Sequence, residues 1–332
     1  MNEIVDPMNV IALTSRVRLA RNYADVPFPQ RMSDHDYETI IERTENALVG
    51  GDYTLKRMAA LSKNARGCLV EEHRISPELA ERDSGAVLLH EERAVSVMIG
   101  EEDHLRIQAL LPGLQLVDAM QLADHVDRAI ERTERFAFDR KWGYLTSCPT
   151  NTGTGMRAGV MLHLAGLSML SQTGQVIQAV SQLGLTVRGL YGEGSEASGH
   201  MYQLSNQVTL GRTEEEILKL LNDTAEQVIG KERAARQLLL ERDRIGLEDK
   251  LMRSCGVFAN ARVMTVKEFM NRLSNARLAA DYGMIRITQA QLTELMNDVQ
   301  PATLERSAGR NLTQKERDIL RAEIIRKRLT SL

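Results

Sequence analysis

The stretch CPTNTGTGMRAG, residues 148–159, is the part of the sequence from which we begin to infer the fold of the chain. Gly153 and Gly155 have no side chains, so we expect the backbone of this turn to pass close to a ligand. WGYLTS, residues 142–147, has the composition of a strand, and the mostly apolar segment 156–170 is predicted to be a helix. A strand, a glycine turn and a helix in this order are typical of nucleotide-binding folds.

The glycine turn matches the known nucleotide motifs poorly. Gly153, Gly155 and Ala158 satisfy the dinucleotide fingerprint GxGxxA, but no Asp or Glu occurs between Arg140 and Gly192 to bind a ribose. No GK[ST] closes the turn, so a P-loop is excluded. A nicotinamide-dependent dehydrogenase therefore survives only as a weak alternative. A segment with basic residues and no acids favours phosphate, although a buried pair of apolar helices would also exclude acids.

Arginines recur at strand positions whose neighbours are apolar. In TSRVRLARN, residues 14–22, Val17 and Leu19 alternate with two arginines, as in a strand with one buried face. DHLRIQ, residues 103–108, repeats the pattern. Each arginine alone would be read as a surface residue. Together they could form a guanidinium cage for a triphosphate, because planar guanidinium forks match phosphate oxygens; the five are Arg16, Arg18, Arg106, Arg157 and Arg188.

Composition limits the class of protein. The chain has 332 residues, 43% hydrophobic and 26% charged, which suits a globular protein of about two domains. A net charge of -3 gives no general attraction to nucleic acid or anionic membranes. The three cysteines are widely spaced and form no CxxC pair, so we expect no disulfide framework, no cysteine zinc site and a cytoplasmic location. No signal peptide and no apolar run near 20 residues is present.

The order of elements predicts an α+β fold. Ser33 begins a helix that ends at Gly50, residues 86–90 and 94–100 form a hairpin, and residues 114–138 form a helix. Residues 185–191 and 200–210 are two further strands. After about residue 213 the pattern changes to charged amphipathic helices. We place a boundary near Gly230, which gives a catalytic domain at 1–230 and a helical domain at 231–332.

Two carboxylates accompany the arginines. Glu102 lies in GEEDHLRIQ shortly before Arg106, and Glu193 lies in RGLYGEGSEASG shortly after Arg188. Acids that only paired with the arginines would cancel the phosphate site. We therefore expect the two carboxylates to face the second substrate, and a cationic phosphoryl acceptor would need them.

Four segments together carry a family resemblance: TSRVRLARN, GEEDHLRIQ, CPTNTGTGMRAG and RGLYGEGSEASGHMYQLSNQ. In this order they resemble the signature segments of the guanidino (phosphagen) kinases, and most closely the bacterial protein arginine kinases. RDILRA, residues 317–322, resembles an element of that bacterial branch. The resemblance implies an antiparallel sheet flanked by helices and a helical domain for dimerisation and phosphoarginine binding. It also implies ATP and Mg²⁺ as cofactors.

The resemblance also implies roles for single residues. The five arginines would bind nucleotide phosphates, His73 would lie near the nucleotide, Glu102 would be the catalytic carboxylate and Glu193 would hold the guanidinium. Cys148 would support the guanidinium site, whereas its residue type alone favours a small buried hydrophobe. The phosphoarginine site would comprise Arg317, Asp318 and Arg321; the pattern alone favours a solvated helix. The chain departs from the family at Thr14, Gly100 and Gly159, which changes no charge.

The activity that follows is ATP-dependent phosphorylation of arginine side chains in proteins. Kinases of small guanidino compounds place a helical domain ahead of the SRVR segment, and here only 14 residues precede Ser15. The alternatives are a kinase for free arginine or another small guanidino compound, and a non-catalytic phosphoarginine-binding module. The family implies clients marked for a Clp protease in the stress response, a Clp ATPase, a zinc-binding activator, a heat-shock repressor and a homodimer. We expect no direct binding to nucleic acid or membranes.

Overall fold

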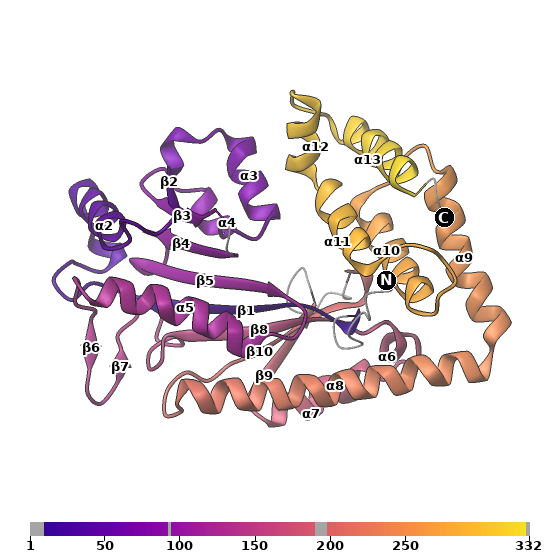
Figure 1. The fold of residues 1–332 in the computed structure, drawn as a ribbon, viewed down its shortest axis with the longest axis horizontal. Helices are drawn as coiled ribbons and strands as arrows, with labels where there is room; N and C mark the ends of the chain where they lie inside the picture. Colours follow the sequence, from indigo (N-terminus) through magenta and orange to yellow (C-terminus); the bar gives the residue numbers. More distant parts are fainter. Residues whose placement is uncertain (1–9, 92–93, 190–197, 330–332) are drawn as a thin grey trace.

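The computed structural model describes residues 10–91, 94–189 and 198–329. Its main feature is an eight-stranded sheet of order β2-β3-β4-β5-β1-β8-β10-β9 in which all neighbours are antiparallel (Figure 1). The strands, in that order, are β2 (Tyr53–Arg57), β3 (Ala86–His90), β4 (Val95–Ile99), β5 (Leu105–Pro112), β1 (Ala12–Arg21), β8 (Met156–His163), β10 (Met201–Asn206) and β9 (Leu185–Gly189). The predicted α+β fold and the predicted hairpin are confirmed.

One face of the sheet is covered by helices and forms the main core. The helices are α2 (Asp34–Ala47), α5 (Leu116–Glu131) and the first part of α8 (Glu214–Arg242). Val17, Leu19 and Leu105 are fully buried in this core. Because side chains alternate along a strand, Arg16 and Arg18 of β1 and Arg106 of β5 project from the opposite face, whereas Arg21 lies on the core side and pairs with Asp127 of α5 at 2.8 Å. The alternation predicted from the sequence therefore decides which face carries the charges.

The opposite face is covered in two places. Helices α3 (Lys63–Glu71) and α4 (Pro77–Ala80) enclose a small core against β3 and β4, which includes Met58, Leu79 and Met98. Beyond the β1 end lies a helical region made of α9 (Arg244–Asn260), α10 (Val266–Asp281), α11 (Gln289–Asp298), α12 (Pro301–Ala308) and α13 (Gln314–Arg328). The arginine-bearing part of the sheet lies between these two groups of helices.

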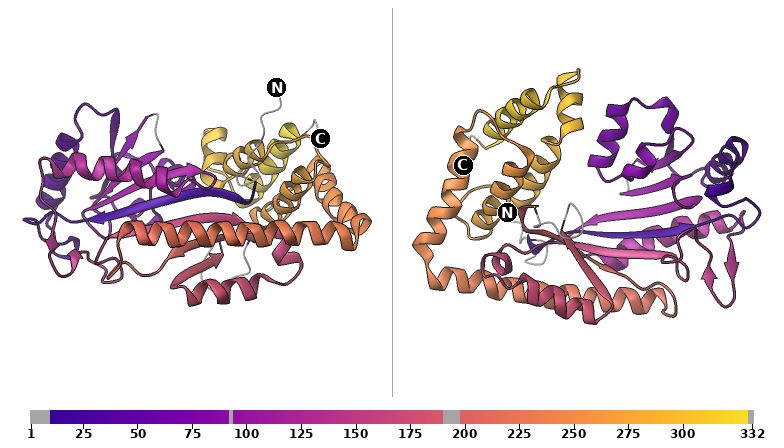
Figure 2. Two further views of the ribbon diagram at one scale, coloured as in Figure 1. Left: turned by 60° about the horizontal axis from the view of Figure 1, so that its bottom comes forward. Right: turned by 180° about the vertical axis from the view of Figure 1, so that it is seen from behind.

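A long helix connects the sheet to the helical region. Figure 2 shows α8 running along the sheet and on to α9, and the two helices meet at Asp243. The boundary that we predicted near Gly230 falls within this continuous helix. From Glu214 to Arg328 all regular elements of the described chain are helices, as the amphipathic pattern predicted. No described helix has both the length and the apolar character needed to cross a membrane.

The structure differs from three of the predicted elements, one in its type and two in their extent. Residues 156–163 form strand β8 at the centre of the sheet, and only the short helix α6 (Ala165–Met169) is helical in the segment predicted as one helix. A continuous apolar run fits a buried strand as well as a helix, so periodicity cannot separate them. Helix α5 ends at Glu131 and not at 138. In the predicted strand at 142–147 only β7 (Gly143–Tyr144) pairs, with β6 (Phe138–Asp139).

A buried polar network joins the sheet to the helical region. The Glu232 carboxylate on α8 accepts hydrogen bonds from the backbone amides that begin α6, at 2.7 and 2.9 Å, and from Arg236 at 2.7 Å. Arg236 also pairs with Asp281 of α10 at 2.7 Å and donates to the carbonyl of His163 at 3.0 Å. The charges and amides are matched within the protein, so this network is structural.

Candidate active site

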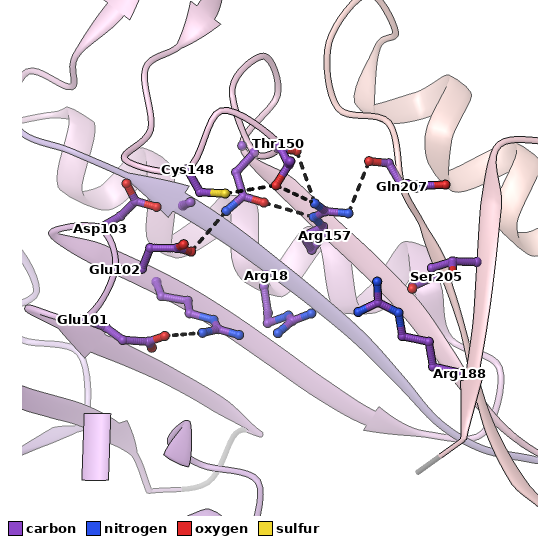
Figure 3. A pocket seen from close by; sticks show the side chains of 15 residues that line it. Arg18, Glu101, Glu102, Asp103, Cys148, Thr150, Arg157, Arg188, Ser205 and Gln207 are labelled. Atoms are coloured by element: carbon purple, nitrogen blue, oxygen red, sulfur yellow. Dashed lines mark hydrogen bonds and ion pairs between the residues drawn. The ribbon is translucent and has the colours of Figure 1, made fainter. Parts of the chain in front are cut away.

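A cavity of about 470 Å³ opens on the arginine-bearing face of the sheet (Figure 3). It is lined by six of the residues that the sequence nominated: Arg18, Arg106, Arg157, Arg188, Glu102 and Cys148. In Figure 3, Glu102 and Cys148 lie on one side, Arg188 lies on the other, and Arg18 and Arg157 lie between them. Residues from four strands and two loops thus meet at one place.

Strand register brings the arginines together. Arg18 on β1 lies opposite Arg157 on β8, and Ala20 lies opposite Arg106 on β5. Directly opposed residues of antiparallel strands project from the same face. Like charges at such positions repel each other. The pairing of Arg18 with Arg157 therefore has an electrostatic cost when no anion is bound.

The cluster holds more positive charge than the described protein neutralises. Arg18 makes no hydrogen bond or ion pair with any described residue, and its Nε atom is buried. Burial and the charges of Arg16 and Arg106 hold the pKa of Arg18 well below its ordinary value. Burial and the charge of Arg106 lower the pKa of Arg16 to about 10. A polyanion bound here would remove this cost.

A second cavity of about 570 Å³ adjoins the first and shares Arg18 and Arg106 with it. Arg16 and His73 line only this second cavity. The segment that bears His73 is held to the sheet because Gln108 on β5 donates to the His73 carbonyl at 2.6 Å. The nominated arginines are therefore divided between two cavities that meet at Arg18 and Arg106.

The three consecutive acids before β5 have different surroundings. Glu101 is buried and forms an ion pair with Arg106 at 2.5 Å. Asp103 is buried and accepts hydrogen bonds from Asn22 at 2.7 Å and from the Ser147 amide at 2.6 Å. Glu102 is exposed to the cavity, and its contact is a long hydrogen bond of 3.4 Å from Asn151. Of the three, Glu102 is the carboxylate accessible to a substrate.

Sequence reasoning missed the residues that hold the site loops together. Asn22, at the end of β1, donates to Asp103 and to the Leu145 carbonyl, and accepts from the His104 amide at 2.8 Å. Nδ1 of His104 accepts from the Tyr23 amide at 3.0 Å, so its Nε2 donates to the Pro27 carbonyl. This network fixes the Glu102 loop beside the Cys148 loop. Its only sequence signal was the polar Asn that follows the arginine strand.

The glycine turn packs closely against protein backbone, and Gly155 also lines the first cavity, so the expected approach to a ligand stays a prediction. A Cβ atom on Gly153, at φ +116°, would approach the Thr209 carbonyl to 2.3 Å. One on Gly155, at φ +65°, would lie 2.6 Å from the Ala20 carbonyl. The glycines therefore allow the loop to pack between β1 and the segment after β10. Gly100 has φ +78°, and a Cβ atom there would lie 2.8 Å from the Tyr37 ring, so glycine suits this position.

The same loop positions Cys148 and Arg157. Cys148 Sγ lies 3.1 Å from Thr150 Oγ1 at the edge of the cavity. Arg157 donates to the side chain of Asn151 at 3.0 Å and to the carbonyls of Thr150 and Asn206 at 3.2 and 3.1 Å. These uncharged partners fix the guanidinium of Arg157 without neutralising it.

The remaining nominated residues lie elsewhere. Glu193 is outside the described residues. Arg317 on α13, in the helical region, pairs with Glu305 at 2.8 Å and lines neither cavity. Arg321 is buried and donates to Asp318 at 2.5 Å and to the carbonyls of Met264 and Val299. The structure thus places these three on one helix but uses Arg321 internally.

The charged face of the antiparallel sheet thus collects arginines beside one accessible carboxylate. Residues 36–235 match the family described as ATP:guanido phosphotransferase, C-terminal catalytic domain, and the chain belongs to this family. Residues 244–332 match the C-terminal domain of the protein-arginine kinase McsB.

Relatives and solved structures agree with this assignment. The chain is 48% identical to a protein-arginine kinase of Geobacillus stearothermophilus and 46% identical to one of Bacillus subtilis (strain 168), with 97% of this chain and 91% of each relative covered. Its fold is similar to that of a lombricine kinase, with TM-score 0.61, 24% identity and coverage of 68% and 67%. A duplicated taurocyamine kinase from Schistosoma mansoni gives TM-score 0.62 at 21% identity, covering 80% of this chain and 40% of that chain. The predicted guanidino kinase fold is confirmed.

Proposed function

We propose that this protein transfers the γ-phosphoryl group of ATP to arginine side chains of proteins. The observation that carries the proposal is Arg18, whose buried Nε atom has no described partner, among the other arginines that line a cavity that Glu102 also enters. A triphosphate supplies the missing negative charge, and the exposed carboxylate suits a cationic acceptor. The names of the bacterial relatives support a protein as the acceptor.

The nucleotide would occupy both cavities. Its phosphates would contact the arginines shared by the two cavities, together with Arg157 and Arg188 on one side and Arg16 on the other. The nucleoside would extend into the second cavity toward His73. The γ-phosphoryl group would then face Glu102 and the Cys148 loop, where the acceptor arrives.

Glu102 would act as the general base of the transfer. An arginine guanidinium has a pKa above about 12, so one N–H proton must leave as the nitrogen–phosphorus bond forms and the bond to ADP breaks. The Glu102 carboxylate would accept that proton. Glu193 would hold the remaining N–H groups as a planar pair, and Cys148 would contact the guanidinium at the cavity edge.

Magnesium would be bound chiefly by the nucleotide. No group of three or more His, Cys, Asp or Glu side chains arranged to hold a metal is found in the described parts of the chain. This fits Mg²⁺, which usually keeps several waters and binds through substrate phosphates and one or two carboxylates. Its chemistry would be to offset the charge of the phosphoryl oxygens, and Glu102 would contact its hydration shell.

The helical region would bind the product. Asp318 would face the guanidino part of a phosphoarginine side chain and Arg317 its phosphoryl group, with Arg321 holding the Asp318 carboxylate in position. We expect Arg317→Ala to weaken phosphoarginine binding at least tenfold in a calorimetric titration, since a charge-assisted contact contributes about 1.5–3 kcal/mol. Unchanged affinity would remove Arg317 from the site.

The biological setting follows from the family. Phosphoarginine would mark client proteins for a Clp ATPase and its protease during stress, with a zinc-binding activator and a heat-shock repressor as further partners. The catalytic part would extend through α8, and the helical region from α9 would support a homodimer. These roles rest on the match of residues 244–332.

The proposed activity is tested with labelled ATP, Mg²⁺ and an arginine-rich protein, with free arginine in a parallel reaction. We expect acid-labile label on arginine of the protein and little on free arginine. Free arginine as the better acceptor would support the alternative of a small-guanidine kinase. Label only on Ser, Thr or Tyr would contradict the proposal.

A further inference from the structure

The helical region supplies a large part of the second cavity. Residues of the sheet form its floor, and side chains of α10, α11 and the segment before α12 form the wall that faces them. The wall consists of Met270, Thr293, Met296, Asn297 and Gln300. These residues lie outside the matched catalytic domain and inside the matched C-terminal domain.

The lining of this cavity combines two kinds of side chain. Arg16, Arg18 and Arg106 supply positive charge, and the last two lie where this cavity meets the first. Five methionines from both parts of the chain also line the cavity: Met98, Met161, Met201, Met270 and Met296. Thioethers pack well against flat aromatic rings, and a few polar groups in an apolar pocket fix orientation. Arginines that suit phosphates and methionines that suit a flat ring, in one cavity, match a nucleoside triphosphate.

A specific contact holds the wall near the sheet. Glu71, at the end of α3, accepts hydrogen bonds from the backbone amides of Ala302 and Thr303 at 2.7 and 2.8 Å, and from the Thr303 hydroxyl at 2.9 Å. Beside it Arg306 pairs with Glu72 at 2.9 Å. Figure 1 shows α12 approaching α3 at this point. Both glutamates also line the second cavity.

We propose that α10 and α11 form one wall of the adenosine pocket, and that the contact between Glu71 and α12 holds this wall over the sheet. The inference rests on the proposed function, because it assigns the nucleoside of ATP to this cavity. It gives the helical region a direct part in nucleotide affinity. Met296 packs against the base, and the Asn297 amide contacts its polar edge.

The test compares ATP with inorganic tripolyphosphate, which has the phosphates but no nucleoside. Calorimetric titration is performed on the full chain, on Met296→Ala and on Asn297→Ala. We expect ATP to bind about five- to thirtyfold more weakly to Met296→Ala, from the apolar area lost, and about fivefold more weakly to Asn297→Ala. Tripolyphosphate affinity remains within twofold in both. Glu294→Ala, at an exposed position of α11 outside the cavity, is the matched control and binds both ligands as the parent does.

Glu71→Gln tests the contact with α12 separately. We expect weaker ATP binding, about threefold or more, with tripolyphosphate unchanged, because the wall shifts while the arginines stay. ATP affinity equal to the parent's in the Asn297 and Met296 variants overturns the inference. Failure of the parent chain to bind either ligand instead overturns the proposed function. If Met296→Ala lowers the affinities for ATP and for tripolyphosphate equally, Met296 supports the folding of the whole site. That result also overturns the inference.

Discussion

Arg236 and Arg18 differ in whether the protein supplies a counter-ion for a guanidinium that is removed from solvent. Arg236, at the junction of α8 and α10, has two carboxylates within 2.7 Å, and although burial alone would lower its pKa, Glu232 and Asp281 raise it. Arg18, on the sheet, has no described counter-ion and a pKa well below its ordinary value. Arg236 therefore completes the fold, whereas the unmatched charge of Arg18 supports our proposal that this face of the sheet binds a polyanion.

Replacement of Arg18 gives the largest expected effect. We expect Arg18→Met to lower turnover by about 10³–10⁵, the scale for an arginine that stabilises a transferring phosphoryl group. Because the substitution removes a repulsive buried charge, the unfolding temperature without nucleotide should be unchanged or higher. Kinetics and thermal melts on one preparation check both. A large loss of stability would place Arg18 with the structural arginines.

Glu102→Gln tests the carboxylate beside the cluster. We expect turnover to fall by about 10²–10⁴, as for loss of a general base, with ATP affinity nearly unchanged. The amide keeps an oxygen for the contact from Asn151. Glu101→Gln is the matched comparison, since it loses the ion pair with Arg106 and should weaken ATP binding instead. If Glu101→Gln had the larger effect on turnover at saturating ATP, the base would be Glu101.

Glu232→Ala tests the buried network in which Arg236 pairs with Glu232 and Asp281. This change leaves Arg236 short of one carboxylate and two backbone amides without an acceptor. The expected loss is about 3–5 kcal/mol of unfolding free energy, measured by denaturant titration. Glu226→Ala, at an exposed position of the same helix, should change it by less than about 0.5 kcal/mol. A small effect of Glu232→Ala would mean that the network contributes little to the fold.

The smallest effect concerns pH. His163 Nδ1 faces the Arg236 guanidinium and its Nε2 faces Ser274, and burial followed by the Arg236 charge holds its pKa well below 6.5. The unfolded chain therefore binds a proton below about pH 6.5 while the folded chain does not, so stability falls as pH decreases. The loss is at most about 1.4 kcal/mol per pH unit. His163→Gln should flatten the curve between pH 7 and 5, whereas the exposed His125→Gln should not.

The arginine strands were predictable because strand alternation is a local property. Val17 and Leu19 fixed the buried face, and Arg16 and Arg18 could then only project from the other. The accessibility of Glu102, in contrast to Glu101 and Asp103, could not be predicted. It depends on partners that sequence spacing does not reveal, such as Asn22, which lies 81 positions from Asp103.

Strand β8 shows the same limit for the fold. Its run of apolar residues satisfied a helix and a buried strand equally, and pairing with both β1 and β10 decided between them. The glycine turn before it lies close to the Thr209 backbone, 56 positions beyond Gly153, which the sequence did not reveal.

The sequence by itself determined the fold class, the arginine face and the family, because residue types and short periodicities carry them. The tertiary structure decided which acid reaches the cavity, that the glycine turn serves protein packing, and that the helical region forms a wall of the second cavity. These features depend on which groups find counter-ions and hydrogen-bond partners across distant segments. The physical reason is that the energy of a buried charge depends on every group around it, and only the folded chain specifies those groups.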